Sequence, residues 1–433
     1  MTTDIMLPIG REQIQASASA KQEPEWLTQL RLDALEKAGQ LELPQLEKTK
    51  LDRWNIDQYG QYKLEKAVQH YDELPASLKE VLQGKEYENL LVQQNASVIF
   101  EQLTEDLKSQ GVIFMSLEEA AKVHENLVKP HLMSVVQRDE NKVAALHAAG
   151  FSGGVFVYVP KNVEVQIPLQ AMFLHDQKDT QFSPHILIVA EQHSRVTYVD
   201  YVHSEAEGAN TVHNSVAEVV VKPGAHVTFA SIHQLQEGTT DLSYRRAHVE
   251  NDGKIEWIIG EMNNGNVVSD TTSILKGNGS NSDAKVICIG TKAQKLNITT
   301  RAVHFGKSSN SDMITRATMK DEATAIINGI TKIEKGATHA NGEQTERVLM
   351  LSPKARGDAN PMLLIDEDEV TAGHAASAGQ VNKEQLHYLM SRGISREQAT
   401  KLIITGFLEP IVAEMPIPAL KEQLAQLVER KLG

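Results

Sequence analysis

The 433-residue chain contains a single cysteine, Cys288. One thiol cannot form a disulfide within the chain, and a lone cysteine is ordinary in the reducing cytoplasm. No hydrophobic run reaches the roughly 20 residues that a membrane-spanning helix needs. The first residues, MTTDIMLPIGREQIQ, lack the basic-then-apolar order of a secretion signal. These absences predict a cytoplasmic protein with no membrane partner.

Basic charge is also scarce. The chain has 43 Lys and Arg residues against 57 Asp and Glu residues, so its formal net charge is −14. Proteins that bind nucleic acids rely on basic surface to neutralise phosphates. We therefore expect no nucleic-acid partner.

The common nucleotide and metal motifs are incomplete. The segment from His304 to Ser309 contains Gly-Lys-Ser, but a phosphate-binding loop needs a glycine where this chain has Arg301. The segment GNGSNS has Ser282 where a dinucleotide fingerprint needs its third glycine. There is no HExxH and no pair of cysteines. We expect that the chain does not itself bind ATP.

The stretch from Gly150 to Ile365 has the pattern of successive short strands. Val163, Val165 and Ile167 alternate with polar residues, which is typical of a strand with one buried face. Runs such as VFVYV and ILIV are apolar throughout, which suits strands covered on both faces. Pro-Gly, Asp-Gly and Asn-Gly pairs separate the runs at irregular spacing. This pattern predicts a mainly β fold and leaves a solenoid and a pair of sandwiches open.

Different patterns flank this stretch and predict three domains: residues 1–149, 150–366 and 367–433. In the first we expect a loose segment over 1–21, helices over 24–38, 116–129 and 139–149, and two short strands over 88–100. In the last, Asn382 and Ser395 are placed to begin helices. A final helix carries an apolar stripe that we expect to pack internally: Leu420, Leu424, Leu427 and Val428.

Candidate chemical residues are few. Cys288 lies in an apolar strand, as a small buried hydrophobe or else as a sulfur carrier or cluster ligand. The many histidines of the β stretch are expected to be scattered over strand surfaces, because a metal cluster would require several of them to converge. His374 stands among small residues where strands give way to helices, as a structural histidine or as a ligand at an interface.

Several segments carry a resemblance to a known family. The segment from Val381 to Phe407, VNKEQLHYLMSRGISREQATKLIITGF, is similar to the C-terminal signature of the SufB/SufD iron–sulfur cluster assembly proteins. The segments PMLLI and GHAA, and VYVPKNVEVQIPL upstream, also resemble that family. SufB-like members have a cysteine near Glu346 or Arg347 and a glutamate at Ala375. In both respects this chain is most like SufD.

The resemblance implies a right-handed parallel β-helix flanked by an N-terminal mostly helical domain and a C-terminal helical domain. It implies a scaffold of the cytoplasmic SufBCD complex and not an enzyme. The β-helix would pair with a SufB-type paralogue, and a homodimer is possible in isolation. No cofactor would be bound stably by this chain alone, and an iron–sulfur cluster would be held transiently with SufB. His374 is the candidate metal ligand at that interface.

The resemblance also implies docking of SufC, an ABC-type ATPase, on the C-terminal helices. The candidate docking residues are Leu386, Tyr388, Leu389, Arg392, Gly393, Ile394, Ala399, Ile403 and Phe407. Two alternatives come from other classes of protein. One is a β-solenoid enzyme that acts on polysaccharides, which would need paired carboxylates or a calcium site. The other is a self-assembling structural solenoid.

Overall fold

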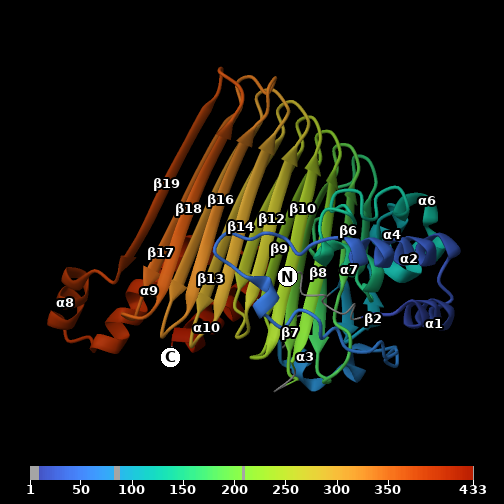
Figure 1. Ribbon diagram of the computed structural model, residues 1–433, viewed down its shortest axis with the longest axis horizontal. Coiled ribbons are helices and arrows are strands. Elements are labelled where there is room, and N and C mark those ends of the chain that lie inside the picture. The colour runs from blue at the N-terminus through green and yellow to red at the C-terminus, as the bar shows by residue number, and fades with distance from the viewer. Residues whose placement is uncertain (1–8, 82–87, 207–209, 433) are drawn as a thin grey trace.

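A computed structural model describes residues 9–81, 88–206 and 210–432. Its strands form two sheets that lie face to face (Figure 1). The first sheet has ten strands in the order β19-β17-β15-β13-β11-β9-β7-β5-β1-β2, and the second has nine in the order β18-β16-β14-β12-β10-β8-β6-β4-β3. Successive strands of the chain thus alternate between the sheets.

The bounds of the strands in the ten-stranded sheet are β1 (Leu90–Gln94), β2 (Ser97–Gln102), β5 (Leu169–His175), β7 (Arg195–Ser204), β9 (His226–Gln234), β11 (Lys254–Glu261), β13 (Asn281–Gly290), β15 (Asn310–Met319), β17 (Asn341–Met350) and β19 (Thr371–Gln380). Those of the nine-stranded sheet are β3 (Ile113–Ser116), β4 (Val155–Val159), β6 (His185–Ala190), β8 (Thr211–Val221), β10 (Thr239–Val249), β12 (Val267–Leu275), β14 (Lys295–His304), β16 (Thr324–Ile333) and β18 (Arg356–Ile365).

The pairing is parallel throughout, apart from β1 with β2 and β3 with β4. Parallel strands that alternate between two sheets make a β-solenoid, so the predicted fold class is confirmed. Asn281 faces Asn310, which faces Asn341, so these coils advance by 29 (310 − 281) and then 31 (341 − 310) residues. This variation explains why the sequence has no strict repeat.

The inward faces of the sheets form an apolar core. Phe229 is 1 % exposed, and its ring centroid lies 5.1 Å from those of Tyr198 and Trp257 on neighbouring coils. Along β6, Ile186 and Ile188 point into this core, whereas Leu187 and Val189 face outward under helices. The apolar runs are therefore strands that are covered on both faces, as the sequence predicts.

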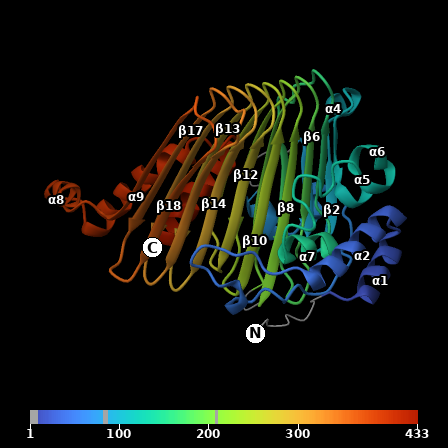
Figure 2. The same cartoon turned by 45° about the horizontal axis from the view of Figure 1, so that its top comes forward.

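The N-terminal helices cover the outer face of the nine-stranded sheet near its first strands (Figure 2). They are α1 (Arg11–Lys21), α2 (Glu25–Gln40), α5 (Leu117–Val123), α6 (Glu125–Val128) and α7 (Lys142–Gly150). The expectation of a loose segment over residues 1–21 is wrong for α1, and residues 1–8 lie outside the described part. Ile14 and Ala18 of α1 are buried, so tertiary contacts support a helix that its polar sequence does not suggest.

The C-terminal helices α9 (Arg396–Val412) and α10 (Pro418–Leu432) cover the opposite side, the outer face of the ten-stranded sheet (Figure 2). The predicted stripe of α10 is buried there, which confirms its role in internal packing. Lys431 holds the end of α10 against the solenoid, because its Nζ donates hydrogen bonds to the carbonyl oxygens of Asn263 (2.5 Å) and Ile289 (2.9 Å). Burial lowers the pKa of Lys431 to about 7.

The β structure exceeds the expected central segment at both ends. Strands β1, β2 and β3 precede residue 150, and β19 follows the expected boundary at residue 366. The remaining short helices are α3 (Ala76–Val81) and α4 (Glu105–Ser109), and α8 (Lys383–Ser391) follows β19. Within the described ranges, none of the helices has the length and apolar character needed to cross a membrane.

The core predicts a difference between two phenylalanines of the solenoid. Phe229→Ala should lower the free energy of unfolding by about 3–5 kcal/mol, because it leaves a cavity between two coils. Phe305 is 39 % exposed, so Phe305→Ala should cost no more than about 1 kcal/mol. Urea denaturation of both variants measures the difference, and equal losses would contradict this account of the core.

Candidate functional site

An apolar groove lies where the last coils of the solenoid meet helices α8 and α9. Its volume is about 770 Å³. Both helices begin at a capping side chain. Asn382 accepts a hydrogen bond from the backbone N–H of Glu384 (2.8 Å) at the start of α8, and Ser395 accepts one from Gln398 (3.2 Å) at the start of α9. The groove is lined by Leu349, Gln380, Asn382, Glu384, Gln385, Tyr388, Leu389, Leu402, Ile403, Gly406 and Phe407.

The structure brings four of the predicted docking residues together in this groove: Tyr388, Leu389, Ile403 and Phe407. The others lie around it. Arg392 and Gly393 are exposed at the turn after α8, Leu386 and Ile394 are half-buried, and Ala399 is buried. Leu402 was not among the predicted residues, although it lines the groove and is 54 % exposed. Its position next to Ile403 in an amphipathic helix was the available signal.

The two helices differ in how firmly they are held. Helix α9 buries Ile404, Leu408 and Ile411 against the ten-stranded sheet. The Arg316 guanidinium of β15 donates a hydrogen bond to the carbonyl oxygen of Phe407 and lies over its ring. None of the nine residues of α8 is buried. Helix α9 is therefore fixed to the solenoid, while α8 presents its side chains to the surroundings.

A second feature is the open end of the solenoid, formed by β18 and β19. Each of these strands ends its sheet within the described part of the chain, and β19 is exposed over most of its length. His374 of β19 is exposed and is the register partner of Gln344 in β17. Gln344, Glu346 and Val348 form the inward face of β17, so His374 lies on the inward side of the last coil.

Glu346 is the carboxylic acid beneath this open end. It is 1 % exposed, and its Oε2 atom has no hydrogen-bond partner among the described residues. Burial raises the pKa of Glu346 to about 7. A buried carboxyl group with an unpaired oxygen therefore lies one strand away from His374.

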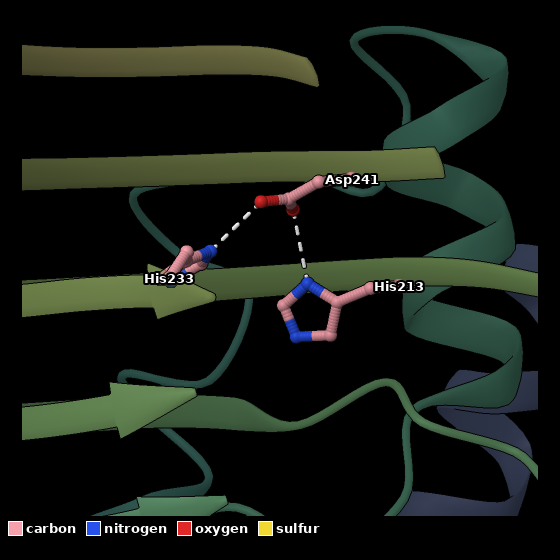
Figure 3. A group of neighbouring side chains, drawn as sticks. All are labelled: His213, His233 and Asp241. Carbon is pink, nitrogen blue, oxygen red and sulfur yellow. Dashed lines mark hydrogen bonds and ion pairs between the residues drawn. The ribbon is translucent and has the colours of Figure 1, made fainter. Parts of the chain in front are cut away.

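A third feature is a polar cluster inside the solenoid (Figure 3). The Asp241 carboxylate accepts hydrogen bonds from Nδ1 of His213 (2.9 Å) and Nδ1 of His233 (2.8 Å). It also accepts from Ser243 (2.5 Å) and Asn263 (2.8 Å). Burial alone would raise the pKa of Asp241, but His233 and His213 hold it well below its usual range.

His213, His233 and Asp241 could in principle hold a metal ion. However, four donors already occupy the roughly four lone-pair positions that a carboxylate offers. The Arg245 guanidinium also lies 2.9 Å from Nε2 of His233 and can only donate there, so it adds positive charge where a cation would lie. The arrangement fits a saturated hydrogen-bond network that joins coils better than it fits a metal site.

The expectation of scattered surface histidines is wrong for five of them, which are buried: His175, His185, His213, His233 and His304. They are tolerated because polar groups meet them inside the fold. His304, for example, lies between the hydroxyl groups of Ser309 (2.8 Å) and Ser311 (2.9 Å). The sequence could not reveal these partners, because they depend on how the chain turns between strands and, for pairs such as His213 with Asp241, on the register between coils.

Cys288 is fully buried in the interior beside the network. Burial raises the pKa of its thiol to about 12, and the nearby Glu261 carboxylate adds to the shift. The thiolate is the reactive and metal-binding form of cysteine, so this environment disfavours both roles. The geometry supports the interpretation of Cys288 as a small buried hydrophobe.

Comparisons with known proteins agree with these features. Residues 173–407 match the family model described as SUF system FeS cluster assembly, SufBD core domain, and residues 13–171 match the SufBD protein N-terminal region. The chain is 44 % identical to the iron–sulfur cluster assembly protein SufD of Bacillus subtilis over the full length of both chains. It is 29 % identical to SufB of the same organism, over 94 % of this chain and 90 % of the relative. A SufBD family protein of Staphylococcus haemolyticus is 29 % identical over 92 % of this chain and 87 % of its own.

The buried histidines predict how stability depends on pH. Burial lowers the pKa values of His175 and His304 from 6.5 to about 4. The unfolded chain therefore takes up protons below about pH 6.5 that the folded chain does not. Stability is fully present above that pH and falls as the pH drops toward 4. Between pH 7 and 5 each such histidine should cost about 2 kcal/mol.

His304→Gln tests this dependence by urea denaturation at pH 7 and pH 5. The variant should lose about 2 kcal/mol less than the unsubstituted protein over that interval. His387→Gln, which changes an exposed histidine, is the matched control and should leave the difference unchanged. The same pH dependence in all three proteins would contradict the assignment.

Proposed function

The chain belongs to the SufB/SufD family of iron–sulfur cluster assembly proteins and is SufD-like, and from this premise we propose that it is a non-catalytic scaffold subunit of a SufBCD-type complex. Family membership assigns it a role in iron–sulfur cluster assembly, in place of polysaccharide chemistry. The observation that carries the finer proposal is the exposed groove of α8 and α9, at the end of a solenoid in which the N-terminal helices cover the early strands of one sheet and α9 and α10 cover the other.

The groove is proposed to receive a SufC-type ATPase. Tyr388 is 58 % and Leu402 is 54 % exposed, and both line the same concave surface. Large apolar side chains that gather at one exposed place mark a protein contact more often than isolated ones do. Glu384 and Gln385 give the groove a polar rim, as in most protein interfaces.

The way α9 is attached supports a mechanical role. A force that the ATPase applies to α8 and α9 would reach β15 through Arg316, which binds the carbonyl oxygen of Phe407. It would also reach β13, because Lys285 lies 3.7 Å from Glu414, just beyond α9. ATP-driven movement of the docked subunit would thus act on the last third of the solenoid and on its open end.

The open end formed by β18 and β19 is the proposed site of pairing with a SufB-type paralogue. An edge strand offers unpaired backbone groups to another chain, and the inward side chains of the last coil are accessible there. His374 would contribute to a shared ligand set, with the Glu346 carboxyl group one strand below it. The cluster is cargo assembled between the subunits, and no cofactor would remain stably on this chain alone.

Docking is tested with two leucines that are both exposed. Leu402→Glu places a charge in the groove and should weaken capture of the cognate SufC-type ATPase by about tenfold or more, because the charge must be desolvated on binding. Leu64→Glu alters a leucine that is 72 % exposed in the N-terminal part and should leave capture unchanged. Removing the whole C-terminal region would be less informative, since α9 and α10 cover apolar residues of the sheet.

The pull-down decides between two outcomes when both variants melt at the temperature of the unsubstituted protein. Selective loss with Leu402→Glu supports docking in the groove. Equal capture of both variants would contradict it.

The role of His374 is tested within the complex. His374→Ala should leave the three subunits associated but lower the iron and sulfide recovered with the complex several-fold, because a ligand at the junction is missing. Ser377→Ala alters an exposed residue of the same strand on its other face and should have no effect. Normal iron and sulfide content with His374→Ala would remove this residue from the proposed site.

A further inference from the structure

A second cavity lies at the opposite end of the molecule, between the N-terminal helices and the first coils of the solenoid. Its volume is about 430 Å³, within the range of pockets for small organic ligands. Its walls come from helix α1, Arg31 of α2, the segment Gly60–Tyr62, the end of α7 and the loop that carries Gln181. It has no connection with the groove or the open end, so its function is independent of the proposed scaffold role.

Two cationic side chains line this cavity, Lys21 of α1 and Arg31 of α2. The side chain of Lys21 is 8 % exposed and that of Arg31 is 5 % exposed. Burial lowers the pKa of Lys21 and the neighbouring Arg31 lowers it further, against the effect of Glu118. Two buried cations placed close together repel each other, and an anion between them would relieve that repulsion.

The carboxylates that pair with these cations lie outside the lining. Lys21 Nζ contacts Glu118 at 2.6 Å, and Arg31 Nε donates to Glu23 at 3.0 Å. Neither Glu118 nor Glu23 is among the residues that line the cavity, and no other Asp or Glu of the described chain lines it. The charged side chains that line the cavity are therefore both cationic, and their carboxylate partners lie behind its wall.

One hydrogen-bond donor of Arg31, beneath the wall of the cavity, remains unused. Arg31 Nη1 donates to the carbonyl oxygen of Phe151 (2.8 Å), but Nη2 is buried and has no partner within the described residues. Leaving such a charged donor unsatisfied in the interior destabilises the folded protein. Nη2 is covered from the cavity, so a ligand oxygen would remove that cost after a small shift of the guanidinium, and the unused donor supports a ligand bound in that way.

The remaining walls determine the kind of anion. Ile14 and Phe151 supply apolar surface, and the Tyr62 ring lies 4.0 Å from Lys21 Nζ. Arginine and lysine together suit phosphate oxygens, because guanidinium presents several fixed donors and ammonium adds a point charge. The cavity exceeds what a free phosphate would fill. We propose that this cavity binds a small organic phosphate, with the phosphate at Arg31 and Lys21 and the apolar part against Ile14 and Phe151.

Binding would also have a structural consequence. The cavity joins α1 to the loop that carries Gln181, and Gln181 in turn donates to the carbonyl oxygen of Gly150 at the end of α7. A ligand in contact with α1 and α7 would hold the N-terminal helices on the first coils. Ligand binding should therefore raise the melting temperature as well as give a calorimetric signal.

Phenyl phosphate is the probe for this site, with inorganic phosphate and phenol as its separate halves. Isothermal titration calorimetry on the full chain should give a Kd of about 1 mM or tighter for phenyl phosphate and at least about tenfold weaker binding for either half. Absence of phenyl phosphate binding would overturn the proposal. Equal affinity for inorganic phosphate would overturn the assignment to an organic phosphate.

A matched pair of substitutions on α1 locates the binding. Ser17 lines the cavity, so Ser17→Glu places a carboxylate beside Lys21 and should weaken phenyl phosphate binding by at least about tenfold. Ser19 of the same helix is exposed and does not line the cavity, so Ser19→Glu should bind normally. Both changes keep Arg31 and its partners intact. Equal binding by the two variants would place the phosphate elsewhere and overturn the proposal.

Discussion

Each coil of this protein is held by the backbone hydrogen bonds that it makes with the coil before it, and such a stack has two ends that the pairing itself cannot close. At the first end the chain closes the stack with its own short antiparallel strands: β2 on β1 and β3 on β4. At the other end β18 and β19 remain as edges. Pro361 in β18 lacks a backbone N–H and is tolerated because that strand is an edge. The proposed difference in function between the two ends follows from this contrast, since the chain covers its first end with its own strands and leaves the last coil open to the proposed partner.

The outer faces of the sheets are also covered along part of the solenoid and left open near its last coil. N-terminal helices cover the early strands of one sheet, and α9 and α10 cover the other. Farther along the nine-stranded sheet, the segment before α3 crosses the coils, with Lys48 3.2 Å from Asp358 of β18. Strand β19 and helix α8 stand clear of this covering in the described part of the chain. The groove and the open end are therefore neighbours, and a partner on one can influence a partner on the other through the strands that join them.

Inside the solenoid, polar groups must be satisfied by neighbouring coils. On the outer face of the nine-stranded sheet, Asn328 likewise donates to Asn297 and receives from Asn360, at 3.2 Å in each case, so a side-chain ladder follows the backbone ladder there. Asp241 serves the same purpose for the histidines of β8 and β9. Removing one member of such a network leaves a buried polar group without a partner, which is more costly than the bond itself was worth. These networks fix the register of coils whose lengths vary.

Much of the fold could be predicted from the sequence because its signals are local. The hairpin at residues 88–100 and the capping residues Asn382 and Ser395 depend on neighbours in the chain. The strand predicted from the alternation of Val163, Val165 and Ile167 is wrong, because β4 ends at Val159, β5 begins at Leu169, and only an isolated bridge at Glu164 lies between them. The parts that could not be predicted depend on distant contacts. Helix α1 is supported by burial of Ile14 and Ala18, and β19, made largely of small residues, is a strand because β17 pairs with it. The convergence of His213 and His233 required a coil register that irregular turns conceal, and the exposure of Leu402 required the position of α8.

The central claim is that the last coil and the groove beside it are the two contact surfaces of a scaffold subunit. Amide hydrogen exchange, measured on the chain alone and in the assembly with SufB-type and SufC-type partners, tests both surfaces at once. The account predicts slower exchange in the assembly over Arg356–Ile365 and Thr371–Gln380 and over Lys383 to Phe407, with little change in α1 and α2. Unchanged exchange at these segments in a verified assembly, with protection confined to the N-terminal helices, would contradict it.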